Sequence, residues 1–180
     1  MSIPISNPSR NPNNNWEIDP NRNWQINPTR NWQINPARNW QIDPQRNWEI
    51  DPTRNWQINP TRNWQINPAR NWQINPYRNW QLNPKRNWQL DPSKNPNFSG
   101  LYLFNTKGVC EYFVVHIDNA SNRFLLIFNE VNELMAFCVS QGDTFVVYSL
   151  KNIYMGIITS NGKGGYNRFN TQNVWIGYLV

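Results

Sequence analysis

The chain has 180 residues, enough for one or two small domains, and its net charge of +6 and 14% aromatic content fit neither an acidic disordered tail nor a membrane protein. No apolar run approaches the roughly 20 residues that a membrane-spanning helix needs. The first ten residues also lack the charged and then apolar pattern of a secretory signal. We therefore expect a cytoplasmic protein without membrane insertion; secretion by a non-classical route stays an open alternative.

Composition changes sharply midway along the chain. All 14 prolines fall at or before Pro96, whereas all eight glycines and all eight phenylalanines follow it. The excess of basic residues also belongs to the first part, because the remainder is neutral. We predict a degenerate N-terminal cap (1–14), a repeat region (15–94), a junction (95–96) and a small antiparallel β domain (97–180).

An eight-residue pattern recurs ten times without a break over residues 15–94, which indicates a repeat architecture. We number its positions 1 to 8, in the order Asn, Trp, Gln or Glu, Ile or Leu, Asn or Asp, Pro, a variable residue, and Arg or Lys. Because every octad contains proline, one continuous helix is excluded, and the region must be extended, solenoidal or a chain of single helical turns. The tryptophans at position 2 are Trp16, Trp24, Trp32, Trp40, Trp48, Trp56, Trp64, Trp72, Trp80 and Trp88.

Positions 5 to 8 are typical of a type I turn, because a short acceptor side chain precedes proline and no glycine follows. Asp replaces Asn in four octads, which indicates that position 5 accepts a local backbone hydrogen bond through its side-chain oxygen. Position 7 varies freely, so we expect it to face solvent; a recognition code at this position is the alternative interpretation. The four acidic residues at position 5 are Asp19, Asp43, Asp51 and Asp91.

Positions 1 to 4 alternate polar and apolar residues, which predicts a short strand with Trp and Ile on one face. We therefore predict a β-solenoid with two octads per coil, in which the ten tryptophans form the structural core and proline lies at each corner. Pro12 and Pro96 stand where further tryptophans are due and would blunt the exposed β edges. On this model, replacing Trp56 and Trp64 with Ala costs about 3 to 5 kcal/mol each.

Two alternatives to the solenoid remain for the repeat region. One is an extended polyproline-like stalk. The other is a chain of helical turns, with Asn-Pro as the cap and first residue of each turn. The helical alternative places Trp and Ile on nearly opposite faces and therefore predicts no continuous buried stripe.

From Phe98 onward, short β-rich runs alternate with turn residues, as in a small antiparallel β barrel or sandwich. Its core is modest for a domain of this length, so we expect the domain to dock onto the repeat region. The seven predicted strands are 101–104, 109–117, 123–128, 135–140, 144–150, 153–159 and 173–180.

Candidate catalytic residues are few. His116 is the only histidine, and Cys110 and Cys138 are the only cysteines, which we expect to be free thiols in a reducing compartment. A Cys–His nucleophile lacks an orienting third group, and a zinc site lacks a fourth ligand, so we favour a structural role for all three residues. The octad resembles the half-coil of nonapeptide β-solenoids in architecture but lacks their metal-binding Gly and Asp residues. We expect no cofactor, no metal and no enzymatic activity.

Three functions fit this chemistry. The first is a structural scaffold or protein-interaction module, which implies a protein partner or self-association. The second is binding of a polyanion or single-stranded nucleic acid, with tryptophan rings stacked on bases and arginines on phosphates. The third is glycan binding. Burial of the indole rings decides between them, because buried rings cannot stack on a ligand. The candidate binding arginines at position 8 are Arg22, Arg30, Arg38, Arg46, Arg54, Arg62, Arg70, Arg78 and Arg86.

Overall fold

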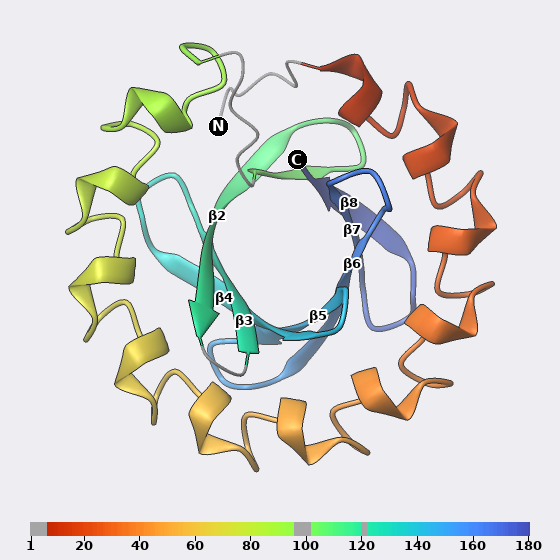
Figure 1. Cartoon of the computed structure of the whole chain (residues 1–180), viewed down its shortest axis with the longest axis horizontal. Coiled ribbons are helices and arrows are strands. Elements are labelled where there is room, and N and C mark those ends of the chain that lie inside the picture. Colours follow the sequence, from red (N-terminus) through yellow and green to blue (C-terminus); the bar gives the residue numbers. More distant parts are fainter. Residues whose placement is uncertain (1–6, 96–101, 120–121) are drawn as a thin grey trace.

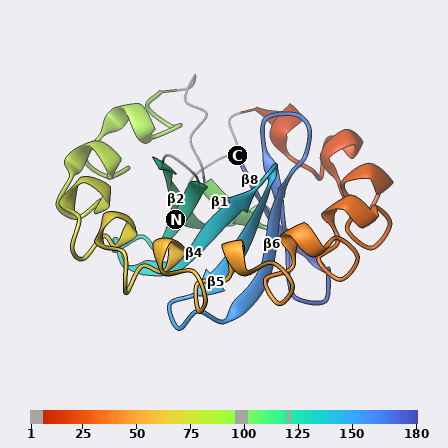
Figure 2. The same ribbon diagram turned by 60° about the horizontal axis from the view of Figure 1, so that its bottom comes forward.

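In a computed structural model, which describes residues 7–95, 102–119 and 122–180, the repeats form an open ring around a β barrel (Figure 1). The first and last octads lie on either side of the gap at the top of Figure 1. Figure 2, tilted by 60°, shows the octads as a belt around the outside of the strands. The predicted contact between the two regions is therefore confirmed in an unexpected form, with one region enclosing the other.

Eight antiparallel strands make the barrel, each paired with its neighbours in the chain, and β1 pairs with β8 to close the sheet. The all-β class and the barrel are thus confirmed. The one strand that the sequence did not predict is β7, whose short YNRF segment alternates tyrosine and phenylalanine with polar residues. The strands are β1 (Tyr102–Asn105), β2 (Cys110–Asn119), β3 (Asn122–Phe128), β4 (Leu134–Gln141), β5 (Thr144–Ser149), β6 (Tyr154–Ser160), β7 (Tyr166–Phe169) and β8 (Trp175–Leu179).

Both faces of the barrel are buried, which explains why its strands carry nearly continuous apolar runs. Along the strands, the residues whose side chains point to one face of the sheet, including Leu125 and Cys138, form one hydrophobic cluster. The opposite set, including Phe124 and Phe137, packs in a second cluster with Ile58 of the ring. The side chains of the second set therefore line the outer face of the barrel, and the ring covers them. Burial of both faces favours unbroken hydrophobic runs over the alternation of a half-exposed sheet.

The ring consists of single 3-10 turns over positions 2 to 4, separated by turns over positions 6 to 8. Asn at position 1 and Asn or Asp at position 5 both have an extended backbone. In one octad φ and ψ are −112° and 103° at Asn55, and −101° and 112° at Asn59. Each caps the next turn by accepting a backbone N–H two residues on through its side-chain oxygen. The 3-10 turns are η1 (Pro8–Arg10), η2 (Trp16–Ile18), η3 (Trp24–Ile26), η4 (Trp32–Ile34), η5 (Trp40–Ile42), η6 (Trp48–Ile50), η7 (Trp56–Ile58), η8 (Trp64–Ile66), η9 (Trp72–Ile74), η10 (Trp80–Leu82) and η11 (Trp88–Leu90).

The predicted β-solenoid is therefore wrong, and the alternative of helical turns agrees with the structure. In a 3-10 turn successive residues are rotated by about 120°, so positions 2 and 4 point in very different directions. Ile58 is fully buried against the barrel, whereas Trp56 is 51% exposed. Proline completes the continuous buried stripe that Trp and Ile alone do not form in helical turns: Pro52 and Pro60 are buried, as Ile58 is, on the inward face of the ring.

The edge role predicted for Pro12 does not hold. Pro12 is buried, and its carbonyl accepts a hydrogen bond from the Arg22 guanidinium, in a part of the ring that contains no strand. Pro96 lies outside the described residues. Asn7 caps η1 as the position 1 residues cap their 3-10 turns, and Asn15 donates to the Ser9 carbonyl as each position 1 asparagine does to position 3, so Asn7 occupies position 1 of a degenerate octad over residues 7–14.

Consecutive octads are joined by a repeated side-chain bond. The amide Nδ2 of each position 1 asparagine donates to the backbone carbonyl of position 3 in the preceding octad, as Asn63 does to Gln57 over 2.7 Å. Eleven such bonds, 2.7 to 3.2 Å long, run from Asn15 to Asn95. Position 1 must therefore both donate and accept, and this explains why it is never Asp. We call this series the asparagine ladder.

Three barrel side chains attach the ring at position 4 carbonyls near its start, middle and end. Asn167 of β7 donates to Ile18, Tyr148 of β5 donates to Ile50, and Tyr102 of β1 donates to Leu90. These carbonyls have no role in the asparagine ladder, which uses position 3. Burial raises the pKa of both tyrosine hydroxyls well above the usual value, so the groups remain neutral donors.

We predict that Ile58→Ala destabilises the protein far more than Trp56→Ala. The isoleucine is fully buried, so its truncation leaves a cavity between ring and barrel and costs about 2 to 5 kcal/mol. Half of the Trp56 surface already contacts water, so its loss costs less. Urea unfolding of the full chain measures both changes. The solenoid model buried both side chains and gave Trp56 a cost of about 3 to 5 kcal/mol, so a loss at Trp56 that equals or exceeds the loss at Ile58 would contradict the ring.

We also predict that one substitution, Asn→Asp, destabilises the protein at position 1 but has almost no effect on stability at position 5. At Asn63 it removes the ladder donor and puts a carboxylate against the Gln57 carbonyl, which costs about 1 to 3 kcal/mol. At Asn67 the carboxylate still accepts the Ala69 N–H and loses no donated bond, so stability changes by less than about 0.5 kcal/mol. Thermal unfolding of N63D and N67D makes the comparison, and equal destabilisation of the two variants would refute the ladder.

Candidate binding surface

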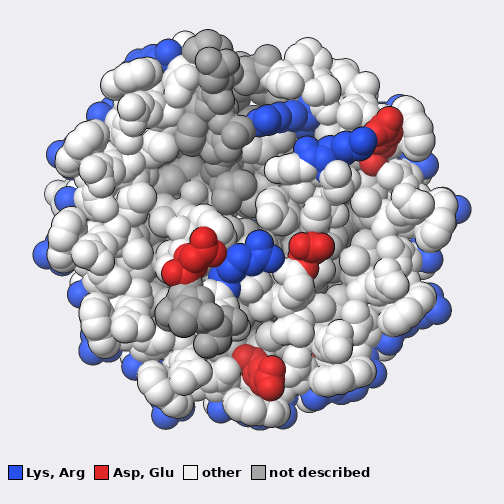
Figure 3. All heavy atoms as spheres, in the orientation of Figure 1, with Lys and Arg blue, Asp and Glu red and all other residues white. Residues whose placement is uncertain are grey.

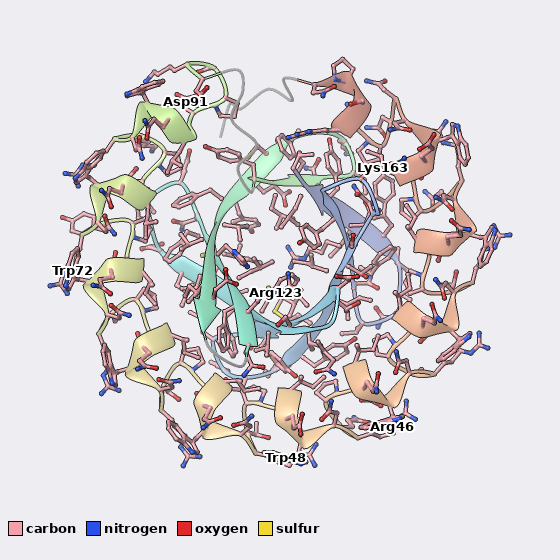
Figure 4. The ribbon with its side chains drawn as sticks, viewed as in Figure 1. Arg46, Trp48, Trp72, Asp91, Arg123 and Lys163 are labelled. Atoms are coloured by element: carbon pink, nitrogen blue, oxygen red, sulfur yellow. The ribbon has the colours of Figure 1, made fainter. Side chains whose placement is uncertain are left out.

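The outer rim of the ring carries tryptophan and arginine from every octad. Positions 2, 3, 7 and 8 face outward, whereas positions 4 and 6 face the barrel, as the burial of each octad shows. Trp48 and Trp72 point away from the barrel, and Arg46 lies on the same outer edge (Figure 4). Basic side chains follow this edge around most of the molecule (Figure 3). The rim is thus a periodic series of indole and guanidinium groups on a rigid frame.

The tryptophans are therefore not the structural core of the repeats, and the sequence prediction is corrected on this point. All ten are 51 to 58% exposed. Within the described residues, none of their indole N–H groups has a hydrogen-bond acceptor in the protein, and none of their rings stacks on another aromatic ring or on an arginine. Each indole presents free ring surface and an unused donor to solvent, which is the condition for ligand stacking.

The solvent-facing side of the turns also agrees with the sequence analysis. Position 7 is exposed in every octad, and Tyr77 is 72% exposed. The carboxylate oxygens of position 5 accept the predicted backbone bond, as Asp51 does from Thr53 over 2.9 Å. The hydrogen bonds from Thr53 and Arg54 hold the pKa of Asp51 below its usual value in spite of its partial burial, so it stays ionised.

Neighbouring octads and the adjacent barrel residues enclose shallow notches. One notch of about 410 Å³ is lined by Trp56, Arg62 and Trp64 of the ring, with Asn122 and Phe124 of β3 on the barrel side. A second, of about 480 Å³, is lined by Trp16, Arg22 and Trp24 of the ring and by Lys163 of the barrel. A notch of this kind offers two ring edges, a cation and several amide groups to a planar or polar ligand.

The candidate catalytic residues do not come together. His116 pairs with Leu125 across the β2–β3 ladder, and Leu125 pairs with Cys138, so the imidazole and this thiol are two strands apart, about 10 Å. Burial raises the pKa of Cys138 to about 12 and that of Cys110 to about 11, which keeps both thiols protonated near neutral pH. The nearest ionisable partner of His116 is Asp118, at 3.5 Å on the surface.

The described parts of the chain contain no group of three or more His, Cys, Asp or Glu side chains arranged to hold a metal ion. No helix among them has the length and apolar character needed to cross a bilayer. Comparison of the chain with protein-family models, with curated proteins and with solved structures found no match.

We predict that tryptophan fluorescence of the native protein is red-shifted and strongly quenched by acrylamide, because ten of the eleven indoles are half exposed. Trp175 is the exception: it is partly buried, and its indole N–H donates to the Gly177 carbonyl over 2.7 Å. The variant Trp175→Phe should therefore lose only a small, protected fraction of the emission. Blue-shifted emission that resists the quencher would contradict an exposed rim.

Proposed function

We propose that the protein is a non-enzymatic binding module whose rim binds single-stranded nucleic acid. The observation that carries this proposal is the exposure of ten indoles that alternate with basic side chains at a fixed interval. Every base has a flat π face, so base–indole stacking tolerates any sequence and contributes about 1 to 3 kcal/mol per base. Guanidinium groups between the rings neutralise phosphates and release counterions.

Single strands fit the rim better than duplexes do. In a duplex the base faces are stacked on one another, so indoles on a convex surface have nothing to stack on. An unpaired strand exposes its bases and is flexible enough to follow a curved row of rings. A ring held by the asparagine ladder and the barrel also keeps the stacking groups preorganised, which lowers the entropy lost on binding.

Two other functions have less support from the same surface. A neutral glycan would use the indoles and the amides of the notches but has no use for the basic charge of the repeats. A protein partner or self-association would favour a continuous apolar patch, whereas the indoles on the rim are separated by arginine and glutamine side chains. The scaffold role belongs, in this proposal, to the inner face of the ring, which holds the binding groups in place.

We predict that a fluorescein-labelled oligothymidylate binds the protein and quenches its tryptophan emission. The logarithm of the binding constant should fall linearly with the logarithm of salt concentration, because phosphate contacts release counterions. Replacing Trp64, Trp72 and Trp80 together with Ala should weaken binding by at least about fivefold, which corresponds to the loss of about one stacked base. Fluorescence anisotropy measures both quantities.

The controls are the same DNA as a duplex and a neutral oligoglucan, both of which should bind more weakly than the single strand. Circular dichroism of the triple tryptophan variant must match that of the parent protein. Binding that does not depend on salt, or an equal affinity for the neutral oligoglucan, would overturn the proposal.

A further inference from the structure

The two halves of the ring differ in charge. In the five octads over residues 15–54, five arginines are balanced by five carboxylates. In the five octads over residues 55–94, four arginines and two lysines face one carboxylate, which leaves a net charge of +5. The entire charge excess of the ring therefore lies in its second half.

Asp at position 5 immobilises the arginine of its own octad. Asp51 Oδ2 accepts the Arg54 Nε–H over 2.7 Å, and the same guanidinium reaches the carbonyl of Pro44 in the preceding octad at 2.5 Å. The octads of Arg22 and Arg46 repeat this arrangement, with the carbonyls of Pro12 and Pro36 as acceptors. These three guanidinium groups are neutralised and used to join octads, so they have little capacity left for a phosphate.

Asn at position 5 releases the arginine. In three of the six Asn octads its amide Nδ2 donates to a proline carbonyl of the preceding octad: Asn27 to Pro20 over 2.9 Å, Asn59 to Pro52 over 3.1 Å and Asn75 to Pro68 over 2.9 Å. In these octads the amide replaces the guanidinium at the same type of acceptor, and in all six the neutral amide does not attract a cation as a carboxylate does. Within the described residues, the arginines of Asn octads that make neither a hydrogen bond nor an ion pair are Arg30, Arg38, Arg62, Arg70 and Arg78.

We propose that a single strand of nucleic acid lies along the half of the rim formed by residues 55–94. This inference rests on the function proposed above and assigns it to one half of the ring, in which three free arginines occur in succession. Arg86 follows them and makes only a long bond, 3.5 Å, to the Tyr77 carbonyl. The choice between Asn and Asp at position 5 sets the binding strength of each octad.

The variable position supports the same half independently of position 5. In residues 55–94 it contributes Tyr77, an additional exposed ring, and Lys85, an additional exposed cation. In residues 15–54 it contributes only uncharged, non-aromatic side chains: Asn21, Thr29, Ala37, Gln45 and Thr53. Both groups that recognise a strand, aromatic and basic, are therefore enriched in the half of the ring that contains three of the five free arginines.

A pair of matched variants of the full chain tests this assignment. One changes Arg62, Arg70 and Arg78 to Gln, and the other changes Arg22, Arg46 and Arg54 to Gln, so both remove three charges from the same octad position. We expect the first to weaken oligothymidylate binding by at least about tenfold and to reduce the salt slope by about 2, since each phosphate contact contributes about 0.7 on a single strand. We expect the second to change affinity by less than about twofold.

Two outcomes separate this inference from the proposed function. Equal losses in the two triple variants, with binding by the parent protein retained, would overturn the assignment to one half and leave nucleic-acid binding in place. No binding by the parent protein would overturn both. Circular dichroism and thermal unfolding of the second variant verify that it keeps its fold, because it removes bonds between octads.

A second pair of variants tests the role of position 5. Asn67→Asp with Asn75→Asp should capture Arg70 and Arg78 and weaken binding. Gln65→Glu with Gln73→Glu adds the same charge to the same octads, at a position where the chain already has Glu17 and Glu49. We expect the first pair to lower the salt slope by about 1.4 and the second to leave it within about 0.5 of the parent value. Equal slopes in the two pairs would show that position 5 does not control the arginines.

Discussion

The hydrogen bond from each position 1 asparagine to the preceding octad is the interaction on which the ring depends. One carboxamide performs two tasks: its oxygen caps the turn that follows, and its nitrogen holds the carbonyl of position 3 one octad earlier. The extended backbone at the cap interrupts the helical path at every fourth residue. Isolated single turns gain little from helix cooperativity, so these side-chain bonds supply the order that a longer helix would obtain from its backbone.

Ring and barrel each bury surface that the other would leave exposed. The barrel has apolar residues on both faces, and without the ring its outer face would be in water. The ring in turn has no core of its own, since Ile50, Ile58 and Ile66 pack in one cluster with the phenylalanines of β2, β3 and β4. The two regions differ in composition, but they complete a single hydrophobic core.

The outward-facing side chains make few structural contacts, apart from Arg22, Arg46 and Arg54, which join consecutive octads. Positions 1 and 5 cap the turns, and position 1 also bonds to the preceding octad. Positions 4 and 6 face the barrel. Positions 2, 3, 7 and 8 face solvent, and yet Trp is present at position 2 in all ten octads. About half of each of these indoles faces solvent, and within the described residues none stacks on another aromatic ring; the nucleic-acid binding that we propose gives the exposed faces a role.

The sequence by itself determined the octad and its period, the turn at positions 5 to 8, the exposure of position 7 and seven of the eight strands. These features follow from local chemistry: proline fixes φ, Asn and Asp cap turns, and β-rich runs alternate with turn residues. The alternation of positions 1 to 4 suits a strand as well as a 3-10 turn, and local rules do not distinguish them. Only the tertiary structure decided that Ile and Pro face inward and Trp outward, because the outer face of the barrel provides the apolar surface that the repeats bury.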